Sequence, residues 1–333
     1  MSKTFTDLTR HALNGPTMGT RWSALFHMPR SFDARPVAAA LAAATAKVDG
    51  QMSTWKPDSD LMRLNSAGQG VWVEVPGELA QVLSIGLHVG MLSGGAFDIG
   101  MGEAVAAWGF GPAPADPTRI GTALAAHRQP AHEVLEVDAV GRRVRKHARM
   151  ALDLSGIAKG YGVDQMAKVI EAFGIPGALV GIDGDLRALG LQPDSSPWTI
   201  AVERPDHVRR APFSVLALED AAVATSGDYR HWVEVAGQRL SHTMDPRRGG
   251  PLVASPASVT VVAATCMEAD AWATALMVKG SLEGAAMARR MGLDALFLDR
   301  DEGGLRPTAV GRLFGQQPPV ELAQHELGEL TGR

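Results

Sequence analysis

Residues 153–164, DLSGIAKGYGVD, combine side chains that could bind a phosphate-bearing ligand together with a metal ion. Asp153 ends an apolar run, and Gly156, Lys159 and Gly160 follow before the pattern becomes helical. Glycines leave the main chain open to a ligand, a lysine can neutralise a phosphate, and the N–H groups of a helix start add positive potential. An N-capped helix with a solvated lysine has the same pattern, and the spacing alone favours that simpler interpretation.

A second pair of polar residues, Asp270 and Thr274, lies in the segment EADAWATAL. The two residues are four positions apart, so on a helix both side chains face the same way. A carboxylate and a hydroxyl are oxygen ligands that suit Mg²⁺, which keeps waters and ligand phosphates in the rest of its shell. A buried aspartate that hydrogen-bonds a neighbouring loop is the alternative, and these two residues alone favour it.

Two further side chains, His242 and Trp55, stand in polar segments. His242, in SHTMDPRRGG, follows an expected strand and precedes a turn rich in Pro and Gly, where a histidine could act as a general base. A lone histidine is more often structural. Trp55, in MSTW, could stack on a planar ring or pack in the core, and nothing local decides between the two.

Composition narrows the class of protein. The chain has 333 residues and a formal charge of -4 from 32 basic and 36 acidic side chains, and no basic stripe indicates nucleic acid. One cysteine, Cys266, excludes a disulfide within the chain and is expected to be buried filler. No apolar run approaches the roughly 20 residues of a membrane span. The sequence as it stands has no signal peptide or lipid-acceptor cysteine, which predicts a cytoplasmic protein, or a periplasmic one if a leader has been removed.

Apolar periodicity predicts an α+β fold with a mainly antiparallel sheet flanked by helices, because strands and helices mix without strict βαβ alternation. The expected strands are 17–27, 71–75, 134–137, 142–146, 150–154, 177–182, 186–189, 198–203, 213–219, 221–228, 232–235, 239–243, 258–264 and, as the last, 294–299. The expected helices are 36–48, capped by Asp33, and 76–93, 103–108, 157–173, 267–278 and 282–291, with a short helix ending 52–65. Turns are expected at 14–16, 138–141, 183–184 and 236–237, a connector at 113–130 and a polar tail at 316–333.

Eight ordered segments together make the chain resemble the ApbE family of FAD-dependent protein flavin transferases. The segments are MGT (18–20), MSTWKPDSDLMRLN (52–65), GGAFDIG (94–100), DLSGIAKGYGVD, GIDGDLRALG (181–190), AVATSGDY (222–229), HTMDPRRGGP (242–251), and SVTVVAA (258–264) followed by EADAWATAL. Each piece is weak alone, whereas their order over residues 18–280 is specific. The GIAKG and H-x-x-DP-x-x-G pieces are the most distinctive.

The resemblance implies a T-fold-like, ApbE-like architecture with a single FAD-binding catalytic domain at 1–315. It implies that Mg²⁺ holds the pyrophosphate of FAD, the substrate, and that the FMN half passes to a Thr or Ser of an acceptor flavoprotein, releasing AMP. By motif match, the FAD contacts would be Met18, Trp55, Ala96, Phe97, Asp98, Asp153, Lys159 and Met244. Asp270, Thr274 and the main-chain oxygen of Gly156 would hold the metal, and His242 would be the base.

The sequence departs from the family pattern at two positions of these motifs. Trp55 stands where the family usually has tyrosine, which keeps ring stacking and removes a phenolic hydrogen bond. Asp183 stands where a glycine pair is usual, which changes the backbone or adds a charge near the site.

Two other functions stay open: an FAD pyrophosphatase that uses water as acceptor and releases FMN and AMP, and a non-catalytic FAD-binding protein.

Overall fold

A computed structural model describes residues 7–206, 210–229, 232–235, 238–302 and 304–314. Its largest element is an eight-stranded sheet in the order β1-β2-β6-β7-β10-β15-β16-β17, with every neighbouring pair antiparallel. The strands are β1 (Leu8–Thr17), β2 (Thr20–Pro29), β6 (Ala178–Ile182), β7 (Asp185–Leu189), β10 (Ala222–Gly227), β15 (Ser258–Ala263), β16 (Asp294–Asp301) and β17 (Gly304–Val310). The predicted α+β class with an antiparallel sheet is therefore confirmed.

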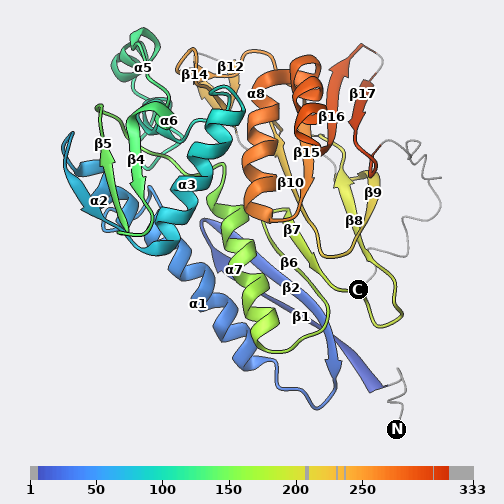
Figure 1. Cartoon of the computed structure of the whole chain (residues 1–333). Helices are drawn as coiled ribbons and strands as arrows, with labels where there is room; N and C mark the ends of the chain where they lie inside the picture. Colours follow the sequence, from blue (N-terminus) through green and yellow to red (C-terminus); the bar gives the residue numbers. More distant parts are fainter. Residues whose placement is uncertain (1–6, 207–209, 230–231, 236–237, 303, 315–333) are drawn as a thin grey trace.

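Three long helices, α1 (Arg35–Met52), α7 (Ala158–Ala172) and α8 (Cys266–Met291), lie side by side over one face of this sheet (Figure 1). The alternation along β16 shows how both faces are buried. Ala295 and Phe297 share an apolar cluster with α8, while Leu296 and Leu298 pack with the two-stranded sheet of β8 (Trp198–Glu203) and β9 (Pro212–Leu218). The main sheet is thus the middle layer between helices and a β-hairpin.

Smaller elements gather beside α1 and α8 (Figure 1). They are α2 (Asp60–Ser66), α3 (Gly77–Leu92), η2 (Ile99–Met101), α4 (Gly102–Ala107), α5 (Pro117–Ala125), α6 (Ala131–Val134), the sheet β3 (Trp72–Glu74), β5 (Arg143–Lys146) and β4 (Leu135–Asp138), and the hairpins β11 (Trp232–Val235) with β12 (Gln238–Ser241) and β13 (Met244–Asp245) with β14 (Gly250–Pro251). None of the helices in the described ranges is both long and apolar enough to span a membrane.

The strand expected at 150–154 is wrong. These residues belong to none of the sheets in the described part of the chain, and the side chain of Asn65 takes the place of a partner strand. Its Oδ1 accepts from Leu152 N at 2.7 Å, and its Nδ2 donates to Leu152 O at 2.9 Å. The apolar run reflects burial, since Leu152 and Leu154 are both in the core.

The turn expected at 14–16 is also wrong, because these residues pair with β2 inside β1. The chain reverses instead at Met18 and Gly19, whose φ angles are 46° and 71°. Two successive positive φ values are what a tight two-residue hairpin needs. The strand expected at 17–27 therefore begins at Thr20, and Met18 lies at the hairpin tip.

Several elements are not predicted by the sequence pattern, among them β1, α6, α5 and β17. The expected connector contains α5, which begins at Pro117 after Asp116, whose Oδ1 accepts from Thr118 N at 2.8 Å. Strand β17 follows β16, so 294–299 is not the last strand.

The expected helix cap at Asp33 is not found. The residue before α1 is Ala34, which makes no side-chain cap, and Asp33 instead accepts from Arg35 N at 3.0 Å.

The remaining expected helices and strands are present, with bounds shifted by a few residues. The break between the two expected C-terminal helices is confirmed as an interruption of α8 at Gly280, whose φ and ψ are 72° and 172°. The expected turn at 236–237 and the polar tail at 316–333 lie outside the described residues.

Candidate functional site

A single cavity of about 1190 Å³ brings together segments from most of the chain. Drug-sized ligands occupy roughly 300–1,000 Å³, so this cavity suits a larger molecule. All twelve site residues expected from the sequence line it: Met18, Trp55, Ala96, Phe97, Asp98, Asp153, Gly156, Lys159, His242, Met244, Asp270 and Thr274. Residues that are far apart in sequence therefore converge on one space.

Asp153 enters the cavity from the extended segment before α7. Its main-chain N–H donates to Ile99 O at 2.9 Å, and its Oδ1 accepts from Ser155 N at 2.9 Å. Its Oδ2 is buried with no hydrogen-bond partner among the described residues, and burial raises the pKa of the carboxyl group. A buried oxygen without a partner is costly, so this oxygen is a candidate to accept a hydrogen bond from a ligand.

Lys159 lies in the first turn of α7 and faces carboxylates. Its Nζ is 3.3 Å from Oδ2 of Asp185 and 3.7 Å from Oδ2 of Asp183. Burial disfavours the ammonium, but Asp185, Asp270 and Asp183 outweigh it and raise the pKa of Lys159. The side chain is 29% exposed and stays charged, so it can meet an anion in the cavity.

Asp270 lies on α8 opposite the start of α7 and is 5% exposed. Its Oδ2 accepts from Gly160 N at 3.1 Å. Burial and the neighbouring Asp185 raise the pKa of Asp270 to about 8, against the effect of Lys159. One turn further along α8, the Thr274 hydroxyl lies 3.2 Å from the hydroxyl of Ser226.

Gly156 lies directly against the side chain of Thr274. A Cβ at this position would be 3.0 Å from Thr274 Oγ1 and 3.1 Å from the ring of Phe97. Only glycine therefore fits without a shift of its neighbours. The main chain at position 156 is thus close to one of the two side chains expected to hold a metal.

The donor set fits a hard divalent cation. Asp270 and Thr274 offer oxygen atoms, and three carboxylates, Asp183, Asp185 and Asp270, surround the single ammonium of Lys159. This leaves more carboxyl groups than cations around Lys159. The described residues contain no group of three or more His, Cys, Asp or Glu side chains placed to hold a metal. A cation here would rely on hydroxyl, main-chain and ligand oxygens beside Asp270, as Mg²⁺ commonly does.

His242 lines the same cavity and lies between β12 and β13. The Phe110 ring contacts it edge to face, with centroids 6.5 Å apart and planes at 67°. Met244 is buried in a small apolar cluster with residues of α4 and α5. His242 itself is half-buried, and its neighbours Phe110 and Met244 pack in or against this cluster.

Trp55 is 63% exposed and lines the cavity, so it is not a core residue. Of the two interpretations of this residue, core packing is wrong. Its indole is available to stack on a planar ring at the cavity mouth. Asp98 is buried, which raises its pKa, and its Oδ1 accepts from Gly100 N at 2.8 Å and Ala131 N at 3.1 Å.

The sequence profile of the ApbE family matches residues 18–297. The chain belongs to the ApbE family. It is 34% identical over 302 residues to an FAD:protein FMN transferase of Vibrio cholerae, covering 89% of this chain and 90% of that protein. It is also 34% identical over 301 residues to the enzyme of that name from Escherichia coli K12, covering 87% and 84% of the two chains.

Solved structures support the same assignment. The fold is similar to the apo form of the flavinyl transferase ApbE from Pseudomonas stutzeri, with a TM-score of 0.81, 33% identity, and coverage of 94% of this chain and 99% of that one. The flavin transferase ApbE from Vibrio cholerae gives a TM-score of 0.79 at 31% identity, covering 91% and 97%. The ApbE-like architecture implied by the motifs is therefore confirmed.

Several residues of this ApbE-family site are missed by the sequence reasoning. Asp164 ties α7 to α8, because its carboxylate accepts from Cys266 N at 2.9 Å, from Met267 N at 3.0 Å and from Arg187 Nη1 at 2.5 Å. It thereby fixes the start of the helix that carries Asp270. An aspartate inside an apolar helical pattern is the available signal, since a buried carboxylate needs partners.

The β8–β9 hairpin supplies a further wall of the cavity that sequence reasoning does not predict. Tyr229 Oη donates to Oε2 of Glu203 at 3.2 Å, and Arg210 Nε lies 3.8 Å from Oε1 of the same carboxylate. All three residues line the cavity. No local motif marks Glu203 or Arg210, because strand pairing alone brings them there.

Proposed function

We propose that this chain transfers the FMN moiety of FAD onto a Thr or Ser hydroxyl of an acceptor flavoprotein, in a Mg²⁺-dependent reaction that releases AMP. The observation that carries the proposal is the convergence of Asp153, Lys159, His242, Asp270 and Thr274 on one cavity. The relatives named FAD:protein FMN transferase support the same reaction. We further propose that residues 1–315 form the single catalytic domain.

The reaction is a phosphoryl transfer, in which positioning and charge neutralisation provide most of the catalysis. The acceptor oxygen would attack the phosphorus of the FMN half, and the bond to the AMP phosphate oxygen would break. Mg²⁺ bound by Asp270, Thr274 and the carbonyl of Gly156 would supply neutralisation of the diphosphate charge. Lys159, held by Asp185, would bind a phosphate oxygen from the α7 side.

The proton of the acceptor hydroxyl must leave during the attack. His242 is the candidate base, because it lines the cavity that holds Lys159 and Asp270 and its ring packs edge to face against Phe110. An imidazole that is neutral near pH 7 can accept this proton. Trp55, exposed at the cavity, would stack on a ring of FAD.

The direct test incubates the protein with FAD, Mg²⁺ and candidate acceptor flavoprotein domains. We expect flavin fluorescence that stays with the acceptor in a denaturing gel, a mass gain of one FMN on a Thr or Ser, and an equal amount of AMP. His242→Ala should bind FAD but lose the transfer.

Two other outcomes would replace the proposal. FMN and AMP formed equally without any acceptor, with no covalent flavin, would indicate a pyrophosphatase. FAD binding with neither product, in the wild type and with every acceptor tried, would indicate a flavin-binding protein without catalysis.

A further inference from the structure

A small lobe forms the cavity wall beside His242. It consists of α4, α5 and the β13–β14 hairpin, in which α5 contacts both α4 and β14; α5 and β14 are labelled near each other in Figure 1. Its interior is an apolar cluster separate from the main cores, made of Met101, Ala104, Ala107, Ala123 and Met244 with Val105, Trp108, Phe110 and Ile120 packed against it. Met101, Val105, Phe110 and Met244 also line the cavity. The inner side of this lobe is therefore the cavity wall next to the proposed base.

Four arginines belong to the segments that form the lobe or adjoin it, and we call them the arginine corner: Arg119, Arg128, Arg247 and Arg248. Arg119, Arg247 and Arg248 are exposed, and Arg128 is half-buried with Nη2 donating to Ala123 O at 2.6 Å. Across residues 109–130 and 244–253 there are only two acidic residues, Asp116 and Asp245. This corner is thus locally basic on a chain whose formal net charge is -4.

The two acidic residues are engaged with the backbone. Oδ1 of Asp116 accepts from Arg119 N at 3.2 Å as well as from Thr118 N, and Oδ1 of Asp245 accepts from Arg247 N at 2.9 Å. Within the described part of the chain, none of the four guanidinium groups forms an ion pair with a carboxylate. The charges of the exposed Arg119, Arg247 and Arg248 are available to a partner, whereas the charge of Arg128 also acts on Asp98.

The turn that carries Arg247 and Arg248 is held in place from behind. The carbonyl of Asp245 accepts from Arg248 N at 3.1 Å and from Gly249 N at 2.8 Å. The indole Nε1 of Trp108, in the lobe, donates to Gly249 O at 3.2 Å. A fixed turn presents its side chains at a lower entropy cost on binding than a mobile loop.

Apolar surface adjoins these charges. Leu124 of α5 lies against Gly250, since a Cβ there would be 3.1 Å from Leu124 Cδ2. Leu124 is exposed, and Val253, three residues beyond Gly250, is 75% exposed. Exposed apolar groups beside unpaired charges are typical of a protein-binding rim.

We propose that the arginine corner docks the acceptor protein through an acidic segment that flanks its target Thr or Ser. This inference rests on the proposed function, because a docking surface beside the cavity is needed only if the acceptor is a protein. The acceptor has to bring its hydroxyl to His242, and Pro246 of the same turn lines the cavity. Complementary charge at that rim orients the encounter and speeds it.

The test uses short fluorescein-labelled peptides that contain one Thr flanked by Asp and Glu, and matched peptides with Asn and Gln in their place. Binding is measured by fluorescence anisotropy at low salt, in the presence of FAD and Mg²⁺. We expect the wild type to bind the acidic peptide about tenfold more tightly than the amide peptide, with the preference lost at high salt.

The informative variant is the double substitution Arg247→Gln/Arg248→Gln. It should weaken binding of the acidic peptide about tenfold, the scale of two lost exposed ion pairs, and leave the FAD-induced rise in melting temperature unchanged. The matched control is Arg289→Gln/Arg290→Gln, an exposed arginine pair in the last turn of α8, which should bind the acidic peptide like the wild type.

Equal binding of the two peptides by the wild type would overturn the proposal, and so would an unchanged double variant. A single-stranded oligonucleotide that binds more tightly than the acidic peptide would show that the corner attracts polyanions without regard to the acceptor, which also overturns it. Failure of the proposed function looks different, because the wild type would then form no AMP from FAD with any acceptor, whatever its peptide preference.

Discussion

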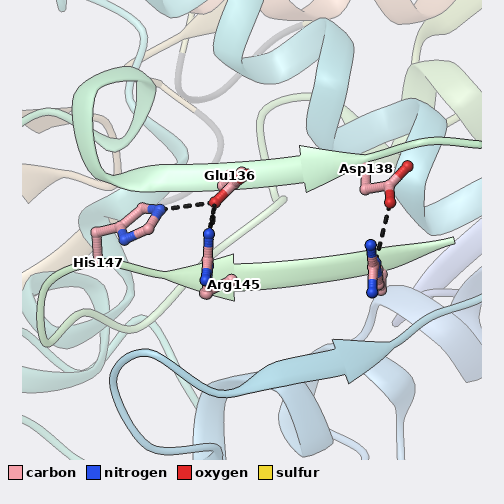
Figure 2. A network of polar contacts seen from close by, with 5 residues as sticks. Glu136, Asp138, Arg145 and His147 are labelled. Atoms are coloured by element: carbon pink, nitrogen blue, oxygen red, sulfur yellow. Dashed lines mark hydrogen bonds and ion pairs between the residues drawn. The ribbon is translucent and has the colours of Figure 1, made fainter. Parts of the chain in front are cut away.

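Two groups of acidic and basic side chains in this molecule have opposite balances of charge. On the three-stranded sheet, Oε2 of Glu136 lies 2.6 Å from Arg145 Nη2 and 2.8 Å from His147 Nε2, and Asp138 pairs with Arg143 (Figure 2). All of these side chains are substantially exposed, and the hydrogen bonds from Arg145 and His147 lower the pKa of Glu136. At the cavity, the ammonium of Lys159 faces the three carboxylates of Asp183, Asp185 and Asp270.

The difference teaches where to look for function. Exposed ion pairs in which every carboxylate has a cation add little to stability and need no ligand to balance them. In the group around Lys159, burial raises the pKa of Asp185 and of Asp270. The ionised form of each carboxyl is therefore destabilised unless a cation binds beside it. An unbalanced buried group is a mark of a binding site, whereas a balanced exposed one is a mark of a surface.

The largest expected effect comes from Asp270→Asn. Removing the carboxylate should lower FMN transfer at least about hundredfold and abolish the rise in melting temperature that Mg²⁺ gives the wild type. Without Mg²⁺ the variant should be as stable as the wild type or more so, because Asp185 loses a repulsive neighbour. Thermal unfolding with and without Mg²⁺ checks this, and a Mg²⁺ response that survives in Asp270→Asn would refute the assignment.

The second largest effect is expected from Lys159→Met. It leaves Asp185 buried without its cation and should cost about 2–4 kcal/mol of unfolding free energy, as well as weaken FAD binding. Adding Asp185→Asn should recover most of the stability and none of the FAD affinity. Urea denaturation and FAD titration of both variants separate the two effects, and additive stability losses in the double variant would mean that the pair is not coupled.

Gly156→Ala should have a milder effect than Asp270→Asn. The new methyl group would lie 3.0 Å from Thr274 Oγ1, so we expect a loss of about tenfold in FMN transfer and a higher Mg²⁺ requirement. A Mg²⁺ titration of the initial rate measures it. If Gly156→Ala abolished the dependence on Mg²⁺ while Asp270→Asn did not, the expected metal arrangement would be wrong.

Asp183→Gly tests one of the two positions at which the sequence motifs predict a departure from the family pattern. Asp183 has a φ of 51°, a region that glycine occupies without strain, and its carboxylate faces Lys159. The variant should gain about 1 kcal/mol of unfolding free energy or less, since the flexibility of glycine offsets part of the relief. FAD should bind a few-fold more tightly, because Lys159 loses a competing carboxylate. Weaker FAD binding in isothermal titration would show that Asp183 assists the ligand.

The smallest effect is expected on the exposed sheet. Glu136→Gln removes the charge that Arg145 and His147 share and keeps an acceptor for one of them. Its melting temperature and rate of FMN transfer should match those of the wild type within the scatter of the measurement. A loss comparable to that of Lys159→Met would abolish the contrast between the two groups.

The sequence motifs predict which residues line the cavity better than the sequence pattern predicts the path of the chain. The motif residues converge on one cavity because each belongs to a short segment with its own recognisable pattern, such as GIAKG before α7. The segment 150–154 is mistaken for a strand because its partner is the side chain of Asn65, 87 residues away. Helix α5 is missed although Asp116 and Pro117 mark its start, because the Ala- and Pro-rich composition masks the signal.

Relations that depend on tertiary contact leave no local trace. The charge balance around Lys159 requires Asp185 and Asp270 from other elements, and the arginine corner forms only when α5 packs against β14. Residue spacing and periodicity carry no information about the charge balance or the arginine corner, since these two features depend on how separate elements pack against each other.

The hydrogen bonds of Asp164 have a consequence for how binding can be observed. The carboxylate on α7 holds the first two amide protons of α8, those of Cys266 and Met267, while Oδ2 of Asp270 holds the amide of Gly160 on α7. Each helix thus secures the other's first turn. Ligand binding on either side should slow amide hydrogen exchange on both, so the two helix starts report occupancy as one cooperative unit.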